Sequence, residues 1–246
     1  ELRAAHQGLT GVAARRKRAR RPWRLQLAAL IVLAALLAAA WYWWDIQSFA
    51  PDESAFSEQG AAVSERQGLV GFETIRALGG SFAYLEASAG AQEQDARFSR
   101  NLAAARRAGL KAGAIHRFDP CIMADGQSAR FVVIVPRGGD LLPPTIALDR
   151  IADECPAPVG EAEVESELMT LINQIEAHSG KPAILQVSQA FEDRYGLASR
   201  LERHLWVVGT WRQPTYAARP WLMWTANEAL WTDAAEEPLR WVVVRK

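Results

Sequence analysis

Residues 60–68 read Gly-Ala-Ala-Val-Ser-Glu-Arg-Gln-Gly, a short apolar run followed by a polar loop that ends in glycine. Such a run, bounded by turn residues, predicts a buried β-strand and the turn after it. Short apolar runs recur along the chain and alternate with stretches of helical period. We predict strands at residues 61–64, 82–86, 112–116, 145–149, 183–187, 205–209, 221–224 and 241–244.

Two stretches between these strands have the period of an amphipathic helix. Residues 95–108 and residues 161–178 each place apolar side chains on one face, and Gly180 ends the second stretch. Strands that alternate with helices are typical of a parallel sheet or a closed barrel. With about eight strands, we predict an α/β fold, a TIM-like (β/α) barrel over residues 59–246.

An apolar run precedes this domain. Residues 25–44 are apolar except for Gln26, and about 20 helical residues span the hydrocarbon core of a bilayer. The run ends in four aromatic residues, 41–44, which fit an interfacial aromatic belt. We expect one transmembrane helix that contacts the lipid bilayer. A cleavable signal peptide is the alternative, because the alanine-rich stretch offers small residues for a cleavage site.

The charges before the apolar run predict the topology. Eight of the first 24 residues are basic, and only Glu1 is acidic there. The positive-inside rule places residues 1–24 in the cytoplasm and the domain on the periplasmic or extracytoplasmic side of the cell membrane. Residues 45–58 are short and polar, and we expect a linker. Topology accounts for the basic run, so we expect no nucleic-acid partner.

The two cysteines, Cys121 and Cys155, both follow the membrane segment, on the side where oxidation is permitted. We expect a disulfide that closes a loop of about 35 residues and stabilises the fold by roughly 3 to 4 kcal/mol. Two free buried thiols are the alternative. No ligand set has metal-binding spacing, so we predict neither a metal nor a cofactor.

The opening stretch, residues 60–68, resembles the first strand and loop of glycoside hydrolase family 25, the lysozymes or N-acetylmuramidases. Residues 82–90, 95–118 and 143–149 resemble later segments of that family in the same order. The resemblance implies a lysozyme-like barrel, peptidoglycan glycan strands as the ligand, and a compartment bounded by a cell wall. It also places a helix end at residues 131–135, where β-branched side chains favour a strand, and we leave this element open.

Several acids of that family are replaced in this chain. Ala62 stands where the first strand of the family carries an aspartate, and Ala89 stands where the second carries a glutamate. The central strand ends in Asp-Arg-Ile instead of Asp-x-Glu, so Ile151 replaces the family's proton donor. The final strand, residues 239–246, has no carboxylate. The acids before it would lie at the wrong end of a parallel barrel: Asp233, Glu236 and Glu237. The resemblance therefore implies a catalytically impaired muramidase that binds cell-wall glycan.

Two strand-end carboxylates remain as catalytic candidates, Glu86 and Asp149. An active muramidase with this rewired pair is the alternative function, and it requires carboxyl groups about 5 to 9.5 Å apart. An isolated strand-end carboxylate is more often solvated, or held by an arginine such as Arg117 or Arg150.

The active site of a parallel barrel lies at the C-terminal ends of its strands. This rule and the family resemblance select Ser64, His116, Gln186 and Trp224 as candidate substrate-binding residues. A structural hydrogen bond also explains a strand-end histidine, and tryptophans commonly fill barrel cores. A third function is a structural domain that contacts a cell-envelope protein, which a large exposed apolar patch without a groove would favour.

Overall fold

The computed structural model describes residues 23–245, and the chain divides into two compact units, Glu1–Trp43 and Trp44–Lys246. Helix α1 (Trp23–Gln47) has 25 residues, none of them buried. By length and composition, α1 is able to cross a membrane. A signal sequence near an N-terminus has the same length and composition. The predicted span lies within α1, whereas the predicted basic tail falls largely on residues 1–22, outside the described residues.

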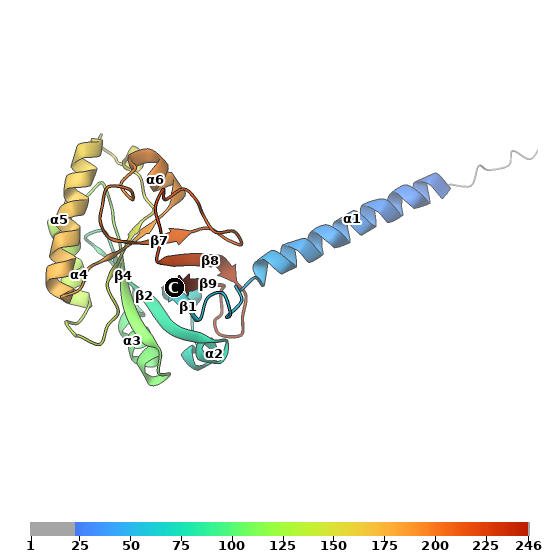
Figure 1. Cartoon of the computed structure of the whole chain (residues 1–246), viewed down its shortest axis with the longest axis horizontal. Helices are drawn as coiled ribbons and strands as arrows, with labels where there is room; N and C mark the ends of the chain where they lie inside the picture. Colours follow the sequence, from blue (N-terminus) through green and yellow to red (C-terminus); the bar gives the residue numbers. More distant parts are fainter. Residues whose placement is uncertain (1–22, 246) are drawn as a thin grey trace, which may run out of the picture. The chain divides into compact units, whose positions relative to one another are not determined.

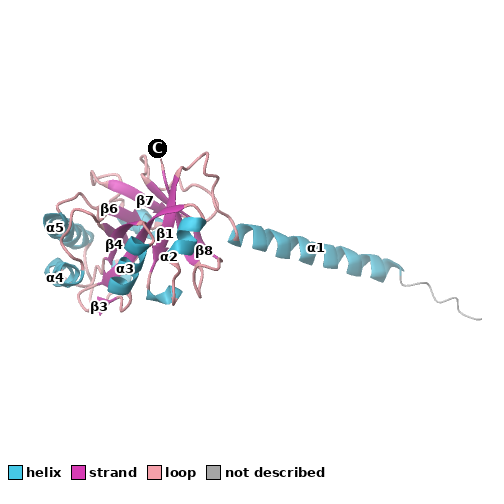
Figure 2. Ribbon diagram, turned by 90° about the horizontal axis from the view of Figure 1, so that it is seen from below, coloured by secondary structure: helices cyan, strands magenta, loops and turns pink. Residues whose placement is uncertain are grey.

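The second unit is a closed barrel. Its strand order, β1-β9-β8-β7-β6-β5-β4-β2, closes because β1 pairs with both β2 and β9, and β3 adds to β2 as a short edge strand. Figures 1 and 2 show the strands at the centre with helices around them. The predicted α/β barrel of about eight strands is confirmed. The strands are β1 (Glu58–Val63), β2 (Gly80–Ala89), β3 (Glu93–Gln94), β4 (Lys111–Arg117), β5 (Thr145–Leu148), β6 (Ile184–Val187), β7 (His204–Val208), β8 (Met223–Leu230) and β9 (Leu239–Val244).

Helices cover the outside of the barrel (Figure 2). Helices α3 (Phe98–Arg107) and α5 (Glu161–Ser179) agree with the two predicted amphipathic stretches. Gly180 ends α5 with a left-handed backbone, a conformation that glycine adopts without strain. Helix α4 is Ala124–Ile134, so residues 131–134, the element left open above, are the end of a helix, and Val135 follows it with an extended backbone. Two short helices complete the set, α2 (Phe72–Ala77) and α6 (Gln189–Tyr195).

Strand β9 runs against its neighbours. It is antiparallel to both β1 and β8, whereas β1, β2 and β4 to β8 form a parallel series. The prediction that the acids before this strand lie at the wrong end of the barrel is therefore wrong. The antiparallel direction brings residues 233–238 to the C-terminal end of β1, where the backbone N–H of Glu236 donates to the carbonyl of Gln67 at 3.3 Å.

Alternation along the strands separates two apolar clusters. One fills the barrel interior and includes Ala62, Tyr84 and Trp206. The indole N–H of Trp206 donates to Thr225 Oγ1 at 2.7 Å, so this buried donor is satisfied. The larger cluster lies outside the strands, beneath the helices. The barrel is thus a packed core, and a ligand has access to its mouth rather than to a channel.

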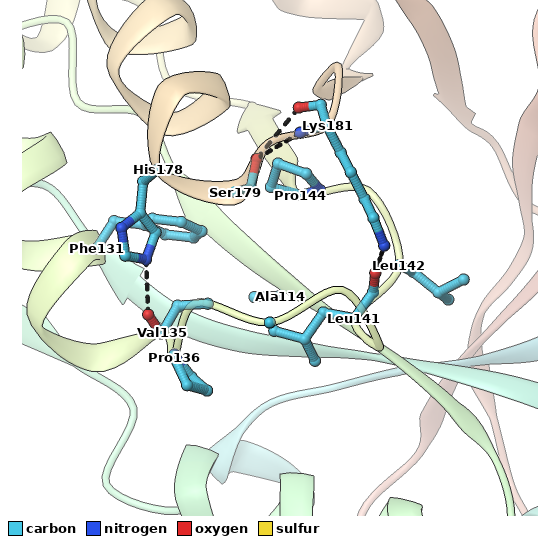
Figure 3. Close-up of a pocket in the computed structure, with 11 residues that line it drawn as sticks. Ala114, Phe131, Val135, Pro136, Leu141, Leu142, Pro144, His178, Ser179 and Lys181 are labelled. Carbon is cyan, nitrogen blue, oxygen red and sulfur yellow. Dashed lines mark hydrogen bonds between the residues drawn. The ribbon is translucent and has the colours of Figure 1, made fainter.

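The connection from α4 to β5 is held by residues at the end of α5. His178 Nδ1 accepts from Arg137 Nε at 3.2 Å, so its Nε2 carries the proton and donates to the carbonyl of Val135 at 2.8 Å. Lys181 Nζ donates to the carbonyl of Leu141. Figure 3 shows both side chains reaching this connection. These contacts fix the chain that leads into β5.

The predicted linker, residues 45–58, is in contact with the barrel. The side-chain amide of Asn227 on β8 lies within hydrogen-bond distance of three backbone carbonyls, those of Ile46 at 3.3 Å, Gln47 at 3.0 Å and Phe49 at 3.0 Å. One amide thus contacts both the C-terminal end of α1 and the segment that follows it.

Further along the same segment, Gln59 Nε2 donates to the carbonyls of Pro51 at 2.9 Å and Phe56 at 3.0 Å. The Phe56 ring lies 6.4 Å from the Trp221 ring and 6.0 Å from the Trp224 ring, centroid to centroid. Residues 45–58 therefore fold onto the outer wall of the barrel instead of forming a free tether.

Cys121 and Cys155 form the predicted disulfide, with a sequence separation of 34 residues. Cys121 lies in the loop after β4, and Cys155 follows the 3-10 turn Ala152–Glu154 after β5. The bridge therefore joins two neighbouring loops at the C-terminal end of the barrel.

Replacing both cysteines with serine should lower the free energy of unfolding by roughly 3 kcal/mol, because the unfolded chain regains the entropy that the cross-link removes. Guanidinium titration followed by circular dichroism measures the loss, with reduced wild type as a second sample. Equal stability of the oxidised and reduced proteins would contradict this expectation.

A fragment that begins at Asp45 should be more stable than one that begins at Gln59, by about 2 to 4 kcal/mol. The shorter fragment exposes the aromatic surface beneath Phe56 and leaves the Asn227 amide without its carbonyl partners. Urea titration of both fragments gives the difference. Asn227→Ala in the longer fragment should account for about 1 to 3 kcal/mol of it. Equal unfolding energies would show that residues 45–58 do not stabilise the barrel.

Candidate functional site

The mouth of the barrel lies at the C-terminal ends of the parallel strands. Side chains alternate along each strand, so the residue two positions after an interior apolar one points into the mouth. For β9, which is antiparallel, the corresponding residue lies two positions before the interior Val242. The mouth therefore has a polar and charged floor: Ser64, Glu86, Arg117, Asp149, Gln186 and Arg240.

Four of these side chains form one network of opposite charges. Arg117 Nη1 lies 3.7 Å from Glu86 Oε2, and Arg117 Nη2 donates to Asp149 Oδ2. Arg240 Nη2 lies 3.6 Å from the same oxygen of Glu86. Burial lowers the pKa of Arg240, and the Glu86 carboxylate opposes that shift. Two guanidinium groups thus face two carboxyl groups, and guanidinium N–H groups are donors to carboxyl oxygens.

Two hollows above this floor share much of their lining. The larger has a volume of about 520 Å³ and the smaller about 250 Å³, and both are lined by Arg66, Glu86, Ala89 and Glu93. We call the two together the groove. Its lining is mainly polar, which suits a hydrophilic ligand better than an apolar one. Within residues 23–245, no group of three or more His, Cys, Asp and Glu side chains is arranged to hold a metal ion.

The disulfide loop fixes the rim of the groove beside β5. Arg150 Nη1 donates to Asp119 Oδ2 at 2.6 Å, and Asp119 Oδ1 accepts the backbone N–H of Cys121 at 2.9 Å. Of the two arginines considered as partners for the candidate carboxylates, Arg117 pairs with Glu86 and Asp149, whereas Arg150 pairs with Asp119.

A family model described as Glycosyl hydrolases family 25 matches residues 62–232, which is more than half of the chain. The chain belongs to glycosyl hydrolase family 25. A curated relative, lysozyme M1 of Streptomyces globisporus, is 41% identical over 58 residues, covering 24% of this chain and 20% of that protein. The matched segment thus spans about a fifth of that relative's length.

Solved structures share the fold. A family 25 glycosyl hydrolase from Bacillus anthracis has a TM-score of 0.72 and 24% identity, over 80% of this chain and 92% of that one. The bacterial lysozyme from Streptomyces coelicolor has a TM-score of 0.68 and 18% identity, over 77% of this chain and 92% of that one. The family 25 resemblance of the sequence is therefore confirmed, in a barrel of the same architecture.

The positions of the missing family acids contribute no carboxyl group to the groove. Ala62 is fully buried in the barrel interior, directly across from Arg240 in the β1–β9 register. Ile151 packs against the outer apolar cluster, and Ala89 lines the groove. Arg240 was not among the predicted site residues, because the sequence does not show that this strand is antiparallel and that Arg240 pairs with Ala62. The one sequence feature that points to Arg240 is that it is the only charged residue in the apolar strand Leu239–Val244.

His116 was predicted to bind substrate, but it lies below the groove. Its ring is fully buried, with Nδ1 2.8 Å from Ser88 Oγ and Nε2 3.3 Å from Gln127 Oε1. Burial lowers the pKa of His116 to about 4, so the ring is neutral at neutral pH. Ser88 lines the smaller hollow, so His116 contacts a groove residue, whereas its own side chain lines neither hollow.

Trp224 was predicted to end a strand and contact the ligand, but it is the second residue of β8. Its side chain is buried in the outer cluster beside Phe56, and its indole N–H donates to the carbonyl of Gly209 at 2.6 Å. Side chains alternate along β8, and because Met223 faces the barrel interior, Trp224 faces outward, away from the mouth. Ser64 and Gln186 do face the mouth, and Ser64 lines the smaller hollow.

The buried His116 ring predicts a pH dependence of stability. Its pKa is about 4 in the folded protein, against 6.5 in an unperturbed histidine, so the unfolded chain binds more protons between these pH values. Stability that is complete above pH 6.5 should fall as the pH approaches 4, by up to about 3 kcal/mol from this residue. Urea titrations across this range should show a shallower fall for His116→Gln. Identical pH profiles would contradict a buried neutral ring.

Proposed function

We propose that this chain is a membrane-anchored family 25 domain that binds the glycan strands of peptidoglycan and is a catalytically impaired muramidase. The observation that carries the proposal is the position of Arg117. Its two terminal nitrogens contact the two remaining candidate carboxylates, Glu86 and Asp149. A glycosidase would require one of these groups to carry a proton and the other to face the sugar.

The replaced acids support the same function. Hydrolysis needs a proton donor for the leaving oxygen and a second carboxylate beside the sugar carbon. Loss of a general acid alone slows such a reaction by a factor of about 10² to 10⁴. In this chain the donor position is Ile151, and the first-strand acid is Ala62. Neither side chain is able to move a proton.

The groove supports a saccharide as the ligand. Its floor is charge-balanced, and its paired arginines and carboxylates offer donors and acceptors to hydroxyl and amide groups. The proteins that this chain resembles in sequence or in fold include lysozymes by name, such as those of Streptomyces globisporus and Streptomyces coelicolor. By analogy with them, we assign cell-wall glycan to this groove.

The membrane part of the proposal rests on α1 and on the charges that precede it. An apolar helix of 25 residues is long enough to cross a bilayer. The basic residues before it favour a single-pass topology with the N-terminus in the cytoplasm and the barrel on the periplasmic or extracytoplasmic side. The disulfide fits this side, because cysteine pairs persist outside the reducing cytoplasm.

A second candidate is an active muramidase that uses Glu86 and Asp149. It is favoured by one observation, that both residues line the same groove. This function requires Arg117 to leave the space between them when a glycan binds. A structural domain that contacts a cell-envelope protein is the third candidate, and the same experiment distinguishes all three.

The full chain in detergent micelles should co-sediment with purified peptidoglycan and release no new reducing ends. Glu86→Gln should weaken binding about tenfold, because it removes the charge that balances Arg117 and Arg240. Asp140→Asn is the matched control, since Asp140 pairs with Arg106 on the outer surface at 2.5 Å, and it should bind like wild type.

The other outcomes favour the other functions. Release of reducing ends that Glu86→Gln or Asp149→Asn abolishes would establish the rewired enzyme. Absence of both release and co-sedimentation would overturn glycan binding and favour a protein partner.

A further inference from the structure

Two charged side chains in the groove have no partner within the part of the chain that the structure describes. Most ionisable side chains that line the two hollows take part in ion pairs or hydrogen bonds. These are Glu65, Glu86, Asp95, Arg117, Asp119, Asp149, Arg150 and Glu154. Arg66 and Glu93 line both hollows, and neither side chain forms an ion pair or a hydrogen bond with any of residues 23–245. The groove therefore contains one unpaired cation and one unpaired anion.

Arg66 lies in the 3-10 turn that follows β1, and hydrogen bonds hold the chain on both sides of it. On one side, the backbone N–H of Glu65 donates to Asp95 Oδ2 at 2.6 Å. On the other side, Gln67 Nε2 donates to the carbonyl of Pro238 at 3.1 Å. The Arg66 side chain is exposed, so the fold fixes where this side chain begins and leaves its guanidinium N–H groups to solvent.

Glu93 lies on the short strand β3, which pairs with the end of β2. The loop between these strands is held in place by two hydrogen bonds. The backbone N–H of Gly90 donates to the carbonyl of Arg117 at 3.0 Å, and Arg130 Nη2 donates to the carbonyl of Gln92 at 2.6 Å. The Glu93 side chain is exposed, so a hairpin that is fixed at its turn presents this carboxylate to the groove.

The two segments that carry these charges are joined to each other. The backbone N–H of Ala96, just after β3, donates to Glu65 Oε2 at 2.9 Å, beside the hydrogen bond from Glu65 to Asp95. Exposed charges are commonly solvated, but Arg66 and Glu93 share the wall of the same two hollows. A ligand that fills the groove therefore meets a guanidinium and a carboxylate whose hydrogen-bonding capacity is unused by the described residues.

We propose that Arg66 and Glu93 bind the charged peptide stem of peptidoglycan, with Arg66 donating to a carboxylate and Glu93 accepting from an ammonium group. The inference rests on the proposed glycan binding and names the part of the polymer that these two residues distinguish. The sugars carry hydroxyl and amide groups, whereas the peptide stem carries carboxylates and, where it is not cross-linked, a free amine. Hydrogen bonds between charged groups are roughly twice as strong as those between neutral groups. A stem with both charges matches the two unpaired side chains, and a neutral saccharide matches neither.

Calorimetric titration of the full chain in detergent micelles tests this inference with soluble peptidoglycan fragments that retain the peptide stem. Arg66→Gln and Glu93→Gln should each raise the Kd about tenfold, because each removes one charge-assisted hydrogen bond. Both side chains are exposed, so both variants should stay folded, which thermal unfolding checks. Arg107→Gln is the matched control for the loss of one positive charge. Arg107 is exposed at the end of α3, lines neither hollow, and should be replaceable without change in Kd.

Modified fragments identify which contact each residue makes. Acetylation of the stem amine should raise the Kd about tenfold for wild type and for Arg66→Gln, but should have no further effect in Glu93→Gln, because both changes remove the same contact. Conversion of the stem carboxylates to amides should weaken binding to wild type and to Glu93→Gln and have no further effect in Arg66→Gln.

The failure of this inference is distinct from the failure of glycan binding. Unchanged affinity in both variants would overturn stem recognition and leave the proposed glycan binding intact. An effect of acetylation as large in Glu93→Gln as in wild type would also overturn it, and so would an equal loss in Arg107→Gln, which would trace the effect to net charge. No binding of the fragments by wild type, together with no co-sedimentation with peptidoglycan, would overturn both.

Discussion

The pairing of β1 with both β2 and β9 closes the barrel, and the site depends on this seam. The strands approach closely at Gly60, where an added Cβ would lie 2.2 Å from the carbonyl oxygen of Phe82. Closure turns the ends of separate strands into one mouth and brings Glu86 and Arg240 within an ion pair. It also sets Arg240 across from Ala62, the position at which the family resemblance implies an aspartate.

The sequence was sufficient to predict the number of strands and the family, because each barrel strand is a short apolar run between turns. It was not sufficient to predict strand direction. An apolar strand such as Leu239–Val244 reads alike in both directions, so the acids before it were placed at the wrong end. The sequence also did not predict that residues 45–58 pack on the barrel, because this packing depends on Asn227, which lies far away in the sequence.

The sequence predicted some of the residues at the mouth of the barrel and misplaced others, because both faces of a barrel strand are buried. Ser64, Glu86, Asp149 and Gln186 face the mouth as expected, whereas His116 and Trp224 face outward. Both faces of a barrel strand are buried, one in the interior and one beneath the helices, so hydropathy does not alternate along the strand. The sequence therefore shows where a strand ends but not which of its last residues points inward.

The folded segment before β1 determines how a pulling force would enter the barrel. Tension on the chain ahead of residue 45 meets the Asn227 hydrogen bonds first, then the hydrogen bond from Gln59 to Pro51, and then the contact of Phe56 with Trp221 and Trp224. Only after these contacts break does the load reach β1 and the seam. Force on the N-terminal side is thus borne first by the outer wall at β8, and the strand that closes the barrel is protected from it.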